Sequence, residues 1–151
     1  MAFALLDIVE QQVRSNKLDA ALDTASRIAD ATDWSAAMGA IAIGQFKAGD
    51  QHGALHTTKL IPYEINRSGV LMHIAFAQAR SGNVTGVIET VKHIEAPLRR
   101  NAVLLGVALI RAKDGDIPGA LATASNIGSE LSRGRAYREI AALQTQKGHL
   151  G

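Results

Sequence analysis

Two histidines have the spacing in this 151-residue chain that most suggests metal chemistry. His52 and His56 lie four residues apart, so on a helix they would share one face. Asp23 and Glu89, at equal distances before and after His56 in the sequence, could add carboxylate oxygens. A zinc site needs three or four ligands, usually including Cys or further His, and the chain has no cysteine. We therefore interpret both histidines as solvated and predict no metal site and no cofactor.

Residues suited to catalysis do not form a recognisable group either. His73 and Glu139 occupy equivalent places in the chain's 33-residue repeat but stand two repeats apart, which is too far for an acid–base pair. The sequence contains no glycine-rich phosphate loop, nucleophile elbow or paired-carboxylate motif. The absence of cysteine also excludes disulfides. We predict a protein that is not an enzyme.

Basic residues recur at one fixed interval and suggest a binding role. The basic row consists of Arg14, Lys47, Arg80 and Lys113, which are evenly spaced. Such a row could bind an acidic segment, because charge complementarity steers association. It could instead be a solvated rim near helix C-termini, where the helix dipole favours positive charge, and the position of all four near predicted helix ends favours this second interpretation. A net charge of +2 is too small to favour nucleic acid, and single-stranded nucleic acid is the least favoured partner.

The interval that separates these cations, a period of 33, governs most of the chain. It is clearest in three rows: Leu22, Leu55, Ile88 and Leu121; Ile28, Ile61, Ile94 and Ile127; and Gly49, Gly82, Gly115 and Gly148. A period of this length indicates small stacked units rather than one globular core. We expect one domain over 1–151, with units near 1–33, 34–66, 67–99 and 100–132 and a half unit at 133–151.

Each unit is predicted to hold two helices. Apolar residues at helical spacing predict first helices near 2–15, 34–48, 67–81, 100–114 and 133–147, and second helices near 17–29, 50–61, 83–94 and 116–128. Gly49, Gly82 and Gly115 can adopt the left-handed conformation that ends a helix, and Asn16 takes this place in the first unit. The residue that follows each glycine, such as Asn83, is a candidate N-cap.

Further rows predict how the helices pack. Small residues recur at two places, Ala42, Ala75, Ala108 and Ala141, and Ala21, Ala54, Val87 and Ala120, where we expect the two helices of a unit to approach most closely. Isoleucine or valine at 41, 74, 107 and 140 should fill the space between units. Arg67, Arg100 and Arg133, at expected inter-unit turns, should bond the carbonyls that end the preceding helix or pair with Glu95 or Glu130.

Several of these features resemble the tetratricopeptide repeat. The resemblance rests on Gly49-Asp50 with Ala54-Leu55, on Gly115-Asp116 with Ala120-Leu121, and on the Ala75 row. The period is shorter by one than the usual 34, as in a divergent bacterial type. Met38, Leu71, Leu104 and Tyr137 stand where the family prefers Trp; Gln12, Gln45, Gln78, Arg111 and Gln144 stand where it prefers Tyr.

The resemblance implies an all-α fold, a right-handed superhelix of about nine helices in antiparallel pairs, and a concave groove lined by the first helices. On this chain the groove face would hold an apolar strip of Phe3, Leu6, Ile43, Phe46, Met72, Phe76, Leu105 and Leu109. The strip predicts an adaptor that binds a peptide or amphipathic helix. Alternatively, curvature of the superhelix buries these side chains against neighbouring units. The family's clamp for a C-terminal carboxylate is not carried over, because Gly39, Ala40, Ile43, Gly69, Met72 and His73 stand at its face.

The ends of the chain suggest a second function. The first helix is unusually apolar, and the last predicted helix lacks a partner helix. A structural subunit that forms a homo-oligomer or larger complex through its ends is therefore the alternative to the adaptor. The N-terminus has no basic segment before its apolar run, and no apolar stretch is long enough to cross a bilayer, so we expect a cytoplasmic protein with no membrane contact.

Overall fold

The computed structural model describes the backbone of residues 2–150 and the side chains of residues 4–148. Over this range the chain is all-helical, with nine α-helices and no strand. The first helices of the repeats are α1 (Ala2–Arg14), α3 (Ala31–Lys47), α5 (Glu64–Arg80), α7 (Pro97–Lys113) and α9 (Glu130–Leu150). The second helices are α2 (Leu18–Ala25), α4 (Gln51–Leu60), α6 (Val84–Val91) and α8 (Ile117–Ala124).

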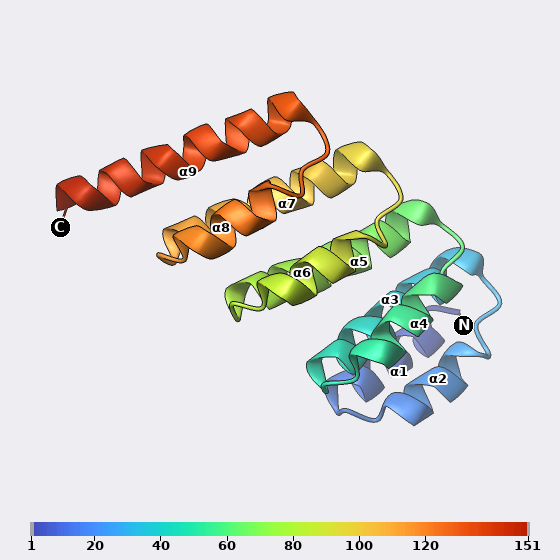
Figure 1. Ribbon diagram of the computed structural model, residues 1–151. Coiled ribbons are helices and arrows are strands. Elements are labelled where there is room, and N and C mark those ends of the chain that lie inside the picture. Colours follow the sequence, from blue (N-terminus) through green and yellow to red (C-terminus); the bar gives the residue numbers. More distant parts are fainter. Residues whose placement is uncertain (1, 151) are drawn as a thin grey trace. The chain divides into compact units, whose positions relative to one another are not determined.

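The chain forms two compact units. The first covers residues 1–70 and contains α1 to α4 and the start of α5. In it α1 packs on both α2 and α3, α2 also contacts α3, and α3 pairs with α4 (Figure 1). The second unit covers residues 71–151. There α7 packs on α8 and α9, while α6 contacts α7 and α8, so first and second helices form two layers.

The turn inside each helical hairpin follows the sequence prediction. Gly49, Gly82 and Gly115 have φ angles of 91°, 81° and 87°, and Asn16 has 57°. This left-handed residue lets the next backbone N–H turn back, and Asp50 N donates to Gln45 O at 2.9 Å. The side chain of Asp50 then accepts from Gly53 N at 2.8 Å, which caps α4. Asn83 and Asp116 cap α6 and α8 in the same way, so the predicted caps are confirmed.

The predicted starts of four first helices are wrong by three residues. The first helices α3, α5, α7 and α9 begin at 31, 64, 97 and 130 rather than 34, 67, 100 and 133, and the second helices end earlier than expected. At α3 the reason is Asp30, whose side chain accepts from Asp33 N at 2.9 Å and caps the helix. At α7 the reason is Pro97, which stands at the first helical position, where its missing N–H costs nothing. The prediction that this helix starts near residue 100 therefore missed that Pro97 begins it.

Burial follows the predicted rows of small and branched residues. Ile41, Ile74 and Val107 are fully buried, and Ile140 is 1% exposed. Ala42, Ala75 and Ala108 are also fully buried. Ala141, the fourth member of that row, is exposed because no second helix covers α9 in the described chain. Small side chains at the close contacts and branched side chains behind them thus form the core of each unit.

Candidate binding face

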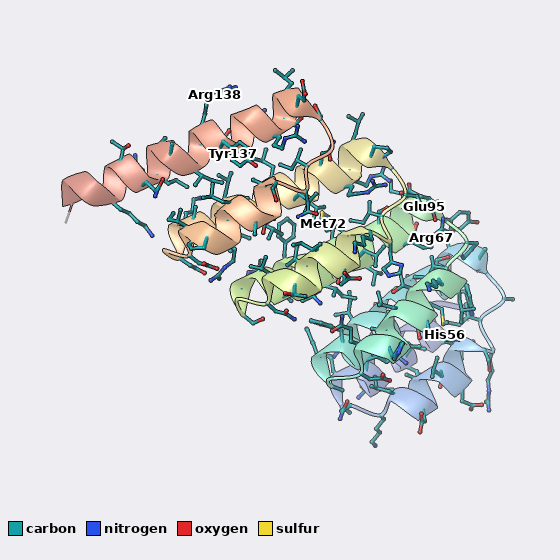
Figure 2. The ribbon with its side chains drawn as sticks, viewed as in Figure 1. His56, Arg67, Met72, Glu95, Tyr137 and Arg138 are labelled. Atoms are coloured by element: carbon teal, nitrogen blue, oxygen red, sulfur yellow. The ribbon has the colours of Figure 1, made fainter. Side chains whose placement is uncertain are left out.

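The apolar strip lies on first helices in both units. In the first unit Leu6, Ile43 and Phe46 are half-buried. In the second unit Phe76, Leu105 and Leu109 are half-buried, while Met72 on α5 is 41% exposed (Figure 2). Phe3 belongs to the predicted strip, but its side chain lies outside the described residues. Within each unit the strip residues are therefore partly covered, and Met72 is the most exposed described member of the strip.

One strip side chain, Phe76, also packs between successive first helices. A Cβ added at Gly106 of α7 would lie 3.0 and 3.1 Å from ring atoms of Phe76, so the ring rests directly on the α7 backbone. In the first unit a Cβ at Gly44 would come within 2.7 Å of Val13 and 3.1 Å of Leu18. Glycine at these positions lets the helices approach closely. Phe76 is thus a packing residue as well as a surface residue.

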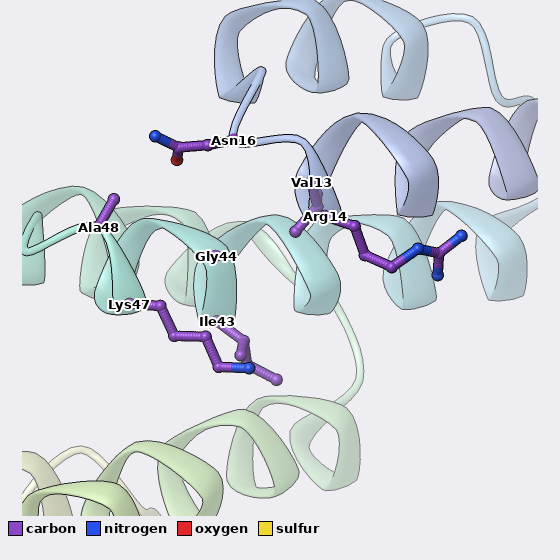
Figure 3. A pocket seen from close by; sticks show the side chains of 7 residues that line it. All are labelled: Val13, Arg14, Asn16, Ile43, Gly44, Lys47 and Ala48. Carbon is purple, nitrogen blue, oxygen red and sulfur yellow. The ribbon is translucent and has the colours of Figure 1, made fainter.

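Two clefts occupy equivalent places in the repeat. The first lies between α1 and α3, has a volume of about 460 Å³ and is lined by Val13, Arg14, Asn16, Ile43, Gly44, Lys47 and Ala48 (Figure 3). The second lies between α7 and α9, has a volume of about 330 Å³ and is lined by Leu109, Lys113, Glu139, Ala142, Leu143 and Gln146. Five of its six residues, all but Glu139, fall in the same rows of the 33-residue repeat as residues of the first cleft. Each cleft joins strip residues to cations of the basic row.

The basic row is exposed, and its side chains have no partner among the described residues. Arg14, Lys47, Arg80 and Lys113 are each the last residue of a first helix. Between residues 4 and 148, none of these four side chains forms a hydrogen bond or an ion pair. Their charges remain favourably placed at helix C-termini, although they do not cap the terminal carbonyls directly.

Two other cations do cap those carbonyls. Arg111 Nη1 donates to Ala79 O at 2.8 Å, and Lys147 Nζ donates to Ala112 O at 3.1 Å and to Lys113 O at 2.5 Å. In both cases a first helix is tied to the end of the first helix before it. The periodic pattern did not indicate this role, because Arg111 and Lys147 are not in the same row. Capping by these residues leaves the basic row available to solvent or a partner.

The arginines at 67, 100 and 133 bond backbone carbonyls just after the ends of α4, α6 and α8, rather than the last carbonyls of these helices. Their guanidinium groups donate to Ile61 O at 2.6 Å, Ile94 O at 3.0 Å and Ile127 O at 2.8 Å, six residues earlier in each case. They lie in the first turn of α5, α7 and α9 rather than in the inter-unit turns. Each arginine therefore fixes the turn that follows a second helix against the start of the next first helix.

A buried side-chain hydrogen bond recurs within two of the repeats. Thr57 Oγ1 donates to Gln45 Oε1 at 2.7 Å, and Thr90 Oγ1 donates to Gln78 Oε1 at 2.8 Å. Gln78 and Thr90 are both 1% exposed, and Gln78 Nε2 has no partner in the described structure. The glutamine row was visible in the sequence as a departure from the tetratricopeptide pattern. The threonine on the following second helix, at the same place in both repeats, was the missed signal.

The histidines considered for metal or acid–base chemistry are exposed, and the carboxylates considered with them have partners. His52 and His56 are exposed on α4, and no group of three or more His, Cys, Asp or Glu within the described range could hold a metal ion (Figure 2 labels His56). Glu139 pairs with Arg135 at 3.0 Å. Hydrogen bonding by Gly119 N lowers the pKa of Asp116, assisted by Arg111, and a bond from Lys92 lowers the pKa of Glu89. Both carboxylates have structural partners that explain these shifts.

None of the helices described here combines the length and the apolar character that crossing a bilayer requires. No family model, curated protein or solved structure matches the chain.

Proposed function

We propose that this protein is a non-catalytic adaptor, a tetratricopeptide-like array that binds an acidic, amphipathic peptide or helix along its first helices. With it we propose the right-handed superhelical arrangement that the resemblance implies. The observation that carries the proposal is a partly exposed apolar strip beside cations that have no partner among the described side chains, in two equivalent clefts. An amphipathic segment would place apolar side chains on the strip and carboxylates beside the basic row.

The basic row favours an acidic partner segment over a purely apolar one. A cation at the end of a helix can stabilise that end by donating to its last carbonyls. Here Arg111 and Lys147 make these hydrogen bonds, so the basic row is not needed for them. The basic row is left with free donors next to Ile43 and Leu109. Because such rim charges are screened by salt, we expect binding to weaken as ionic strength rises.

Selection from a displayed library of helical peptides, with acidic and neutral members in equal number, tests this function. We expect the enriched peptides to be acidic and amphipathic. Met72→Glu should abolish their binding, because it places a charge on the most exposed strip residue. Lys113→Glu should weaken binding about tenfold, whereas Lys59→Glu, at an exposed lysine on α4, should leave it unchanged. Enrichment of neutral peptides, or equal effects of the two lysine variants, would refute the proposal.

A further inference from the structure

One face of α9 exposes residues whose counterparts elsewhere are buried. Tyr137 and Ala141 are the repeat equivalents of Leu104 and Ala108 on α7. Leu104 is 1% exposed and Ala108 is fully buried in the helix on which α8 packs. On α9, Tyr137 is 38% exposed (labelled in Figure 2). Ala141 and Gln144 are exposed as well. This face, Tyr137–Ala141–Gln144, keeps the residue types that receive a second helix.

The rest of α9 is firmly anchored to its own unit. Ala136 is fully buried and Ile140 is 1% exposed, in a helix that packs on both α7 and α8. Lys147 donates to the last carbonyls of α7. The exposed face is therefore held by a fixed helix and does not need to fold around a ligand.

The neighbouring rows of α9 do not suit a further first helix. Elsewhere, successive first helices meet through Gly39 against Val70, Val13 against Gly44, and Phe76 against Gly106. The residues of α9 that correspond to Gly39, Val13 and Phe76 are Arg138, Thr145 and Ala142. An exposed guanidinium and a hydroxyl replace the small or apolar contacts in two of the three rows. A complete repeat, such as α1 and α2 of a second copy, would bury these polar groups at a cost.

The chain's own second helices define the helix that fits this face. All four pair a small residue with a threonine three positions later: Ala21 with Thr24, Ala54 with Thr57, Val87 with Thr90, and Ala120 with Thr123. The small residue is buried, and Thr57 and Thr90 donate to Gln45 and Gln78. Gln144 stands in the same row as these glutamines, two repeats after Gln78, and it lies exposed.

We propose that the Tyr137–Ala141–Gln144 face binds one α-helix of a partner protein that carries the pattern Ala/Val-x-x-Thr. The small residue packs on Ala141, and the threonine hydroxyl donates to the Gln144 side-chain oxygen. This interaction uses a different face from the apolar strip, so it stands or falls independently of the proposed function.

NMR titration of the full chain with a capped peptide of residues 83–94 tests the proposal, because this peptide carries the Val87 and Thr90 pattern. Amide shifts can detect the weak binding expected of a short helix that is only marginally stable in water. We expect saturable shifts centred on Tyr137, Ala141 and Gln144. Shifts centred on other residues, self-association through this face without peptide binding, or no shift at millimolar peptide would overturn the proposal.

Matched variants measure how much each contact contributes to peptide affinity. Ala141→Leu should weaken peptide binding at least tenfold, because a larger side chain prevents close approach. Ala122→Leu, at an exposed alanine of α8, should leave it unchanged. A peptide with Thr90→Val should bind the natural chain about fivefold more weakly than the unsubstituted peptide does. The two peptides should bind a Gln144→Leu chain equally well. A Met72→Glu chain should bind the peptide normally, which separates this face from the strip.

Discussion

The buried pair Gln78–Thr90 allows a quantitative test of how the helices pack. Thr90→Val keeps the side-chain volume and removes the hydroxyl that donates to Gln78 Oε1 at 2.8 Å. Gln78 is 1% exposed and its Nε2 already lacks a partner among the described residues, so the whole amide would be left unsatisfied in the core. An unsatisfied buried polar group costs about 1–3 kcal/mol. We expect a loss of about 2 kcal/mol, or roughly 4–8 °C in melting temperature for a chain of this size.

Replacing the other partner, in a Gln78→Met variant, should reduce stability less than Thr90→Val does. In the next repeat Thr123 Oγ1 donates to Gly119 O at 2.8 Å, four residues back in its own helix. In a Gln78→Met variant Thr90 can donate in the same way to the Gly86 carbonyl. A double variant with both Gln78→Met and Thr90→Val should therefore be about as stable as Gln78→Met alone, because removing both partners leaves no buried polar group of this pair unsatisfied.

Urea unfolding followed by circular dichroism measures all three variants, with Thr123→Val as the control. Thr123 occupies the same row without a glutamine partner, so its loss should cost at most about 1 kcal/mol. If Thr90→Val costs no more than Thr123→Val, or if Gln78→Met is the more damaging change, the hydrogen bond does not have the role assigned to it.

Three further predictions concern the backbone and the charges. Gly44→Ala should destabilise the chain by about 1–3 kcal/mol, because its Cβ would lie 2.7 Å from Val13, whereas Gly69→Ala, with nothing within 4 Å, should stabilise it by up to about 1 kcal/mol; thermal melting that ranks them equally would contradict the contact. Arg133→Met should cost about 1–2 kcal/mol in urea unfolding by removing the donor to Ile127 O at 2.8 Å, and an unchanged midpoint would count against that role. Gly119 N and Arg111 lower the pKa of Asp116 in the folded state, so the carboxylate's contribution to stability is present above the unfolded pKa and is lost as pH falls through the folded pKa. The difference in unfolding free energy between the natural chain and Asp116→Asn should therefore shrink between pH 7 and pH 3, and a constant difference would refute this.

The local geometry of the repeat was predictable because single residues determine it. A positive φ favours glycine or asparagine, so Gly49 and Asn16 mark the turns unambiguously. The caps at Asp50 and Asn83 follow from their place after those turns. The constant period then extended the buried rows from one unit to the next.

Features that depend on pairs of side chains were not predictable in this way. Gln78 looked like a departure from a family pattern, and only its distance to Thr90 shows a buried hydrogen bond. The starts of the first helices were misplaced because the arginine row was assumed to lie in turns, whereas Arg100 reaches back six residues from inside α7. The clefts depend on how closely helices approach, which Gly44 sets through its contact with Val13.

The binding face is proposed to lie on the first helices and not on the second. The chain has no cysteine, so one can be introduced at either of two exposed alanines, Ala102 on α7 or Ala122 on α8, and labelled with an environment-sensitive fluorophore. The measurement is the fluorescence change on adding an acidic amphipathic peptide from the library selection. We predict a saturable change at position 102 and none at 122. A change at 122 alone, or equal changes at both positions, would contradict a binding face on the first helices.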